Sequence, residues 1–158
     1  APSVPEGSQF WLRLPIKIGR LPVAPAPKLA VAVDHSPLKI LVAEDNRVNQ
    51  MVIRETLVRL GHEVHLVASG KAALEALLSE PLGMVLMDLQ MPEMDGLEAT
   101  QQIRSSRLGE GPWIVALTAN AFTEDKERCL RAGMNDYLSK PVRREELEAA
   151  IERARVRS

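Results

Sequence analysis

The chain has 158 residues and a single cysteine, Cys129. One cysteine cannot form an intramolecular disulfide, which excludes a disulfide-stapled secreted scaffold and favours a reducing compartment. No apolar run approaches the roughly 20 residues that a membrane-spanning helix needs, and prolines near the N-terminus interrupt any signal-peptide-like segment. We therefore expect a cytoplasmic location and no membrane contact by this chain, while a parent protein could carry a membrane anchor further upstream.

The sequence also lacks an excess of charge of either sign. It has 20 Lys and Arg against 21 Asp and Glu, a formal net charge of -1. This balance gives no overall electrostatic reason to bind nucleic acid or an anionic membrane surface. We expect neither nucleic acid nor a membrane among the partners.

Prolines are concentrated at the start of the chain, where seven of the 11 fall in the first 37 residues. The Pro- and Ala-rich stretch at 16–37 can form neither a helix interior nor a central strand, so it is predicted to be an extended linker. Residues 8–15 alternate as one strand would, but a single strand cannot bury its apolar face alone. The folded domain is predicted to occupy residues 38–158.

From residue 38 onward, short apolar segments alternate with helical segments. The predicted strands are 39–43, 64–67, 83–87, 113–117 and 136–138. The predicted helices, with their N-terminal caps where one is evident, are 46–60, 69–78, 95–107, 123–132 and 143–154. Such alternation is typical of an α/β protein with a parallel sheet covered by helices on both faces, and right-handed crossovers then favour a doubly wound topology.

The first of these helices shows the pattern most clearly. Asn46 can cap it and Gly61 can end it. The positions that recur at helical spacing within it are Val48, Met51, Val52, Thr56 and Leu60. This spacing is typical of an amphipathic helix.

The carboxyl ends of the predicted strands carry the chemistry-bearing residues. Glu44 and Asp45 follow the first strand, Asp88 the third and Thr118 the fourth, and Lys140 lies just beyond the fifth. In an open parallel sheet these ends meet at one edge, where ligands bind. Each residue alone has an ordinary structural explanation, such as a helix cap or a surface lysine, but the set at corresponding strand ends indicates one site.

Three carboxylates at one edge repel one another. At ~4 Å and an effective dielectric of ~20, each pair costs about 4 kcal/mol before screening. Either one is protonated or a cation lies among them, and oxygen ligands without His or Cys favour Mg²⁺ or Mn²⁺. A metal with open positions beside a lysine is suited to receive a phosphoryl group, with Asp88 as the candidate nucleophile.

Four segments resemble the signature blocks of the receiver domain of two-component response regulators. They are residues 41–46 (LVAEDN), 85–96 (VLMDLQMPEMDG), 116–120 (ALTAN) and 136–141 (DYLSKP). The resemblance covers roughly residues 38–154. It implies a flavodoxin-like, doubly wound sheet of five parallel strands in the order 2-1-3-4-5, with a cis peptide bond before Pro141.

The resemblance also implies the role of each residue at the site. Asp88 accepts a phosphoryl group from phosphohistidine. Asp45 and Asp88 bind Mg²⁺ directly, the backbone carbonyl of Gln90 is a third ligand, and Glu44 assists through a water molecule.

Further roles concern the phosphoryl group and its consequences. By the resemblance, Thr118 and Lys140 contact the phosphoryl oxygens. Thr118 and Tyr137 form a two-state switch, in which the hydroxyl moves toward the phosphoryl group and the aromatic ring changes its burial. Gln90 and Asn120 occupy positions that tune hydrolysis in the family.

A second resemblance lies near the N-terminus, where residues 6–15 are similar to the closing strand of a histidine kinase ATP-binding domain. Residues 1–15 are accordingly predicted to be the remnant of that strand, and the parent protein a hybrid sensor histidine kinase. The chain itself would have no ATP-dependent kinase activity. Its expected partners are a histidine kinase domain, in cis or in trans, and a histidine phosphotransfer protein.

Other functions of the same site stay open at this point. An inhibitory or phosphate-sink receiver would keep every residue named above. An aspartyl-phosphate phosphohydrolase of the haloacid dehalogenase type would require a second Asp two residues after Asp88, where this chain has Gln90. A flavin- or nucleotide-binding module would require a Gly- or Ser-rich loop after the first strand, where Glu44 and Asp45 would repel phosphate.

Overall fold

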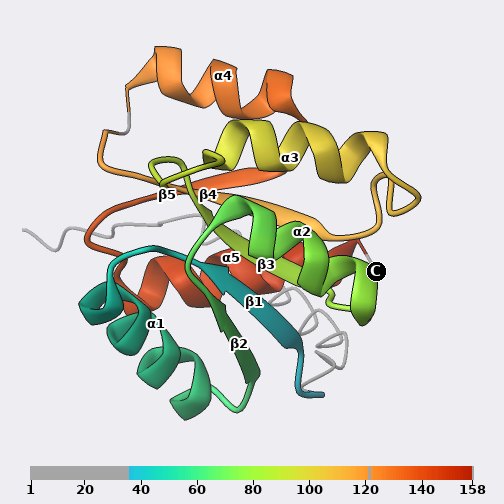
Figure 1. The fold of residues 1–158 in the computed structure, drawn as a ribbon. Helices are drawn as coiled ribbons and strands as arrows, with labels where there is room; N and C mark the ends of the chain where they lie inside the picture. The colour runs from blue at the N-terminus through green and yellow to red at the C-terminus, as the bar shows by residue number, and fades with distance from the viewer. Residues whose placement is uncertain (1–35, 121, 158) are drawn as a thin grey trace, which may run out of the picture. The chain divides into compact units, whose positions relative to one another are not determined.

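The computed structural model describes residues 36–120 and 122–157. In these ranges, five parallel strands form one sheet in the order β2-β1-β3-β4-β5, as predicted (Figure 1). The strands are β1 (Lys39–Ala43), β2 (Glu63–Val67), β3 (Met84–Asp88), β4 (Trp113–Thr118) and β5 (Asp136–Ser139). The strand remnant predicted within residues 1–15, and the linker up to residue 35, lie outside the described residues.

Within the described residues, five helices alternate with the strands (Figure 1). They are α1 (Arg47–Arg59), α2 (Gly70–Ser79), α3 (Gly96–Ser105), α4 (Thr123–Ala132) and α5 (Arg144–Val156). The α3 helix ends at Ser105 rather than at the predicted Arg107, because the N–H of Ser106 bonds back to the Ile103 carbonyl and closes the last turn. In the part of the chain that the structure describes, none of these helices has the length and apolar character needed to cross a bilayer.

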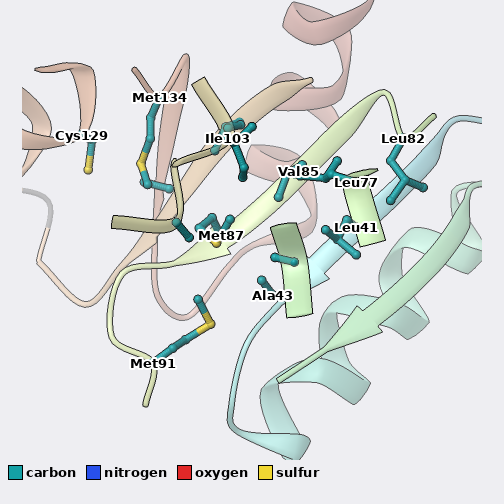
Figure 2. Close-up of a cluster of buried hydrophobic side chains, with 14 residues drawn as sticks. Leu41, Ala43, Leu77, Leu82, Val85, Met87, Met91, Ile103, Cys129 and Met134 are labelled. Atoms are coloured by element: carbon teal, nitrogen blue, oxygen red, sulfur yellow. The ribbon is translucent and has the colours of Figure 1, made fainter. Parts of the chain in front are cut away.

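Successive strand residues point to opposite faces of the sheet and contribute to two hydrophobic cores, one on each face. The first core packs Leu41, Val85 and Ile114 against α2, α3 and α4; Figure 2 shows this cluster. The second core, on the opposite face, packs Ile40 and Leu86 against α1 and α5. Because both faces are covered, β1, β3 and β4 are buried along nearly their whole length, which explains their continuous apolar sequences.

The orientation of α1 differs from the one that its apolar spacing suggested. The helix buries Ile53 and Leu57, whereas the side chains of Val48, Met51 and Val52 are exposed to 69%, 69% and 56%. Asn46 caps α1 as predicted, its side chain accepting the backbone N–H groups of residues 48 and 49. The helix and its cap were therefore predicted correctly, but the predicted apolar stripe was wrong, because it included neither Ile53 nor Leu57.

The register of the sheet places the carboxyl ends of β1, β3 and β4, which carry the predicted site residues, next to one another. Ala43 of β1 lies opposite Met87 of β3, so that Glu44 and Asp88 follow side by side. Asp88 in turn lies opposite Leu117 of β4. Where β4 meets β5, the N–H of Lys140 donates to the Thr118 carbonyl at 2.7 Å.

Candidate functional site

Three acidic residues gather at this edge of the sheet, as their positions after strands predicted. One carboxylate oxygen each from Glu44, Asp45 and Asp88 lies within 4.8 Å of the other two. Glu44 and Asp88 are almost fully buried, at 1% and 3% exposure, while Asp45 is exposed. The cluster thus combines two desolvated carboxylates with one that faces solvent.

Lys140 provides the positive charge that these buried carboxylates need. Its Nζ lies 2.6 Å from Asp88 Oδ2 and 2.8 Å from Glu44 Oε2. Burial alone would lower the pKa of Lys140, but the contacts with Asp88 and Glu44 outweigh burial and raise that pKa above its ordinary value of 10.5. Lys140 is therefore a fixed ammonium at neutral pH, and its peptide bond to Pro141 is cis, as the resemblance implied.

The loop after β3 holds Asp88 in place. The backbone N–H of Gln90 donates to Asp88 Oδ1 at 3.0 Å. Gly96 opens α3 directly against the Asp88 backbone, where a Cβ atom would lie only 2.1 Å from the Asp88 carbonyl oxygen. Only glycine permits this approach, so the start of α3 is part of the support of the site.

Two residues of α1 that the sequence analysis did not single out support Glu44. The Asn49 side-chain amide donates to Glu44 Oε1 at 3.3 Å. The Gln50 amide donates to the Glu44 backbone carbonyl at 2.6 Å and to the Val67 carbonyl at 3.1 Å, which joins the ends of β1 and β2. Their place in the first turns after the Asn46 cap was visible in the sequence, but no spacing signal marked them as functional.

Thr118 lies at the end of β4 and is 5% exposed. Its hydroxyl donates to the Asn120 carbonyl at 2.8 Å, and the same oxygen accepts the Asn120 N–H at 3.1 Å. In this structure the hydroxyl is thus bonded within its own loop. Tyr137 on β5 is half-buried, with Lys126 Nζ 4.4 Å from its ring centroid. The switch assigned to Thr118 and Tyr137 stays a prediction.

A cavity of about 280 Å³ opens beside Asp88. Gln90, Thr118, Asn120 and Lys140 line it together with Asp88, so five of the predicted site residues share one space. Tyr137 is not part of this lining. The cavity is therefore the place where a group attached to Asp88 would be accommodated.

The donor set fits a divalent cation. Three carboxylates against one ammonium leave the cluster with an excess of two negative charges, which a single divalent ion would balance. The ligand atoms within reach are oxygens, which Mg²⁺ prefers, and the described residues around the cluster include neither His nor Cys. The exposed Asp45 leaves one side open for water and for a bound group.

The family model of the response regulator receiver domain matches residues 40–152. The chain belongs to this family. The matched range contains β2 to β5, β1 except for its first residue, and the complete acidic cluster, so the family-level prediction and the flavodoxin-like fold are both confirmed.

Relatives and solved structures extend this finding. Hybrid signal transduction histidine kinase K of Dictyostelium discoideum is 35% identical over 159 residues, which cover 94% of this receiver chain but only 13% of that protein. The receiver domain of sensor histidine kinase PA1611 of Pseudomonas aeruginosa, solved with a magnesium ion in its active site cleft, is 45% identical with a TM-score of 0.71, covering 77% of this chain and 99% of that one.

A third similar structure contains a partner. The receiver domain of the response regulator Ssk1 of Saccharomyces cerevisiae was solved together with the histidine phosphotransfer protein Ypd1. That receiver is 34% identical to this chain, with a TM-score of 0.66, and the match covers 71% of this chain and 84% of that one.

Proposed function

We propose that this receiver domain takes a phosphoryl group from a phosphohistidine onto Asp88 and relays it to or from a histidine phosphotransfer protein. The observation that carries the proposal is the environment of Asp88, a buried carboxylate in contact with Lys140 that lines a cavity of about 280 Å³. Membership of the receiver family and the Mg²⁺-bound relative support it.

In the proposed transfer, an oxygen of the Asp88 carboxylate attacks the phosphorus of the donor. An O–P bond forms while the P–N bond to the donor imidazole breaks, and the nitrogen leaves with the electron pair. The Lys140 ammonium already lies 2.6 Å from Asp88, so it can follow the charge onto the phosphoryl oxygens with little rearrangement. Thr118 would contribute its hydroxyl once it leaves the Asn120 carbonyl.

Mg²⁺, or Mn²⁺ in its place, would be held by Asp45, Asp88 and the Gln90 carbonyl, with Glu44 acting through water. When bound, the metal would supply Lewis-acid neutralisation of the phosphoryl oxygens. Glu44 is suited to an indirect role, because its carboxylate is already engaged by Lys140 and by the Asn49 amide. The exposed Asp45 is suited to a direct one.

The primary test is Asp88→Asn. With acetyl phosphate and Mg²⁺, the wild-type domain should acquire a label that survives acid and is released by hydroxylamine, as an acyl phosphate does, and the variant should acquire none. Asp136→Asn is the matched control, because Asp136 pairs with Arg153 away from the cavity and its loss should leave labelling intact. Stoichiometric labelling of Asp88→Asn would refute the assignment.

The exposed apolar side chains of α1 offer a surface for the partner. Val48, Met51 and Val52 lie on the helix that follows the acidic cluster, and Val52 lines a groove together with Glu44 and Lys140. A histidine-bearing helical bundle docked there would be next to Asp88. The similar receiver solved with Ypd1 supports a partner of this type.

For the longer protein, we propose a hybrid sensor histidine kinase. Residues 1–15 would then be the end of its ATP-binding domain, residues 16–37 a linker and residues 38–158 the receiver. The match with the Dictyostelium hybrid kinase, which extends over 94% of the chain, supports this arrangement. A phosphate-sink receiver is the alternative, and it predicts that transfer from a phosphorylated partner is fast while return to that partner is not detectable.

A further inference from the structure

The cavity beside Asp88 is lined by two cationic residues rather than one. Lys140 is the first, and Arg128 of α4 is the second. No sequence pattern distinguishes Arg128, because it lies in the middle of a helix with many charged residues. Only the packing of α4 over the sheet brings it to the lining that contains Asp88 and Thr118.

Arg128 is held in the cavity lining by a weak partner. Its Nη1 lies 3.6 Å from Asp125 Oδ1, one turn earlier on α4, and Asp125 lines the same cavity. The Arg128 side chain is 63% exposed, so the guanidinium is largely hydrated and the pair contributes little to stability. A stronger anion within reach would therefore draw Arg128 away from Asp125 at small cost.

The proposed function creates such an anion. A phosphoryl group on Asp88 replaces one carboxylate charge by roughly -1.5 to -2 charges and adds three acceptor oxygens. The guanidinium presents several N–H donors in a fork that suits phosphoryl oxygens. Lys140 is already held at 2.6–2.8 Å by Asp88 and Glu44, whereas Arg128, the other cation among the cavity-lining residues, has only the longer contact of 3.6 Å with Asp125.

We propose that Arg128 is a second cationic ligand of the phosphoryl group on Asp88, and that Asp125 competes for the same guanidinium. The exchange of partners would couple α4 directly to phosphorylation. This inference rests on the phosphoacceptor function proposed above.

The same helix contains a matched control. Arg131 pairs with Glu127 at 2.9 Å and is 75% exposed, but neither residue lines the cavity. Removing Arg131 changes the charge of α4 by the same amount as removing Arg128. A difference between the two variants therefore reports on the cavity and not on the general electrostatic field of the helix.

The experiment measures the affinity of the whole chain for beryllofluoride, a phosphoryl mimic, in the presence of Mg²⁺ by isothermal titration calorimetry. Arg128→Ala should raise the dissociation constant about tenfold, the order expected for a charge-assisted contact with a phosphoryl group. The dissociation constant of Arg128→Lys should lie between those of the wild type and Arg128→Ala, because lysine keeps the positive charge but lacks the paired N–H donors of the guanidinium. Arg131→Ala should bind as the wild type does.

Asp125→Asn tests the competition. It should lower the dissociation constant about threefold, because it releases Arg128 from an exposed ion pair. In an Arg128→Ala background the same substitution should have no effect, since Asp125 is proposed to act only through Arg128. Glu127→Gln is the matched control, and it should leave the dissociation constant unchanged both in the wild type and in Arg128→Ala.

Two results would overturn the inference. One is equal affinity of Arg128→Ala and Arg131→Ala; the other is an effect of Asp125→Asn that persists without Arg128. If the wild type itself binds no beryllofluoride and acquires no label on Asp88, the proposed phosphoacceptor function fails and this inference fails with it. If the wild type binds beryllofluoride and is labelled on Asp88, but Arg128→Ala binds beryllofluoride as tightly as Arg131→Ala does, the inference about Arg128 alone is wrong.

Discussion

Replacing Lys140 with methionine removes the ammonium that two buried carboxylates share. At ~4 Å and an effective dielectric of ~20, each contact is worth about 4 kcal/mol before desolvation, and the real distances to Asp88 and Glu44 are shorter. Desolvation of the lysine offsets much of this attraction. Removing one partner of a buried ion pair typically costs 3–5 kcal/mol, and because the Lys140 side chain is still 23% exposed, we expect a loss of about 3 kcal/mol.

The assay is urea denaturation at pH 7 without divalent ions. A loss of about 3 kcal/mol should lower the unfolding midpoint by about 1.5 M, at a slope of about 2 kcal/mol/M. Lys71→Met is the control, because Lys71 is an exposed residue of α2 and its replacement should leave the midpoint unchanged. Added Mg²⁺ should restore part of the stability of Lys140→Met, since a divalent ion can neutralise the same carboxylates.

The pH dependence gives an independent check. The folded-state pKa of Lys140 is raised, so its contribution to stability is complete below the ordinary value of 10.5 and is lost as pH rises through the folded-state pKa. The wild type should therefore lose stability above pH 10.5 in a way that Lys140→Met does not. A variant that unfolds at the wild-type midpoint in the absence of metal would show that the buried carboxylates do not depend on this lysine.

Two further substitutions test the support of the site and the proposed docking surface. Gly96→Ala should destabilise the domain by about 2–4 kcal/mol in thermal or urea unfolding, because its Cβ would meet the Asp88 carbonyl, whereas Gly83→Ala, in open space, should be nearly neutral. Met51→Glu should slow transfer from a phosphorylated histidine phosphotransfer protein about tenfold, with labelling by acetyl phosphate unchanged. Val156→Glu, at an apolar position on α5 that is exposed to 87% against 69% for Met51, is the control. Equal slowing by Met51→Glu of transfer from the partner and of labelling by acetyl phosphate would contradict docking on α1.

The parts of the site that could be predicted from the sequence share one property. Asp88 and Thr118 end β3 and β4, and Asp45 and Lys140 come shortly after β1 and β5, all segments recognisable as strands. Parallel strands bring such positions to one edge whatever the details of packing. Three helix N-terminal caps could also be predicted from the sequence. The side chains of Asn46, Ser69 and Asp95 each accept a hydrogen bond from a backbone N–H in the first turn of their helix.

The side of each helix that faces the core was much harder to predict from the sequence. The apolar residues of α1 include the buried Ile53, which lay outside the predicted stripe, and the exposed Met51, which lay within it. Only packing against the sheet decides which side of the helix faces the core. Arg104 of α3 was missed for a related reason. Its guanidinium donates to the carbonyls of Gly133, Gly109 and Pro112 and to the Asn135 side chain, and so joins loops that are distant in sequence.

Thus the sequence by itself determined the order of the strands and helices, the family and the residues that stand at the strand ends, because these depend on local patterns and on the topology that parallel strands impose. The tertiary structure alone decided that Lys140 lies between Glu44 and Asp88, that the Thr118 hydroxyl bonds to Asn120, and that Arg128 lines the cavity beside Asp88. These features depend on side-chain direction and on the rotation of each helix about its axis, which are set by packing against elements far away in the chain.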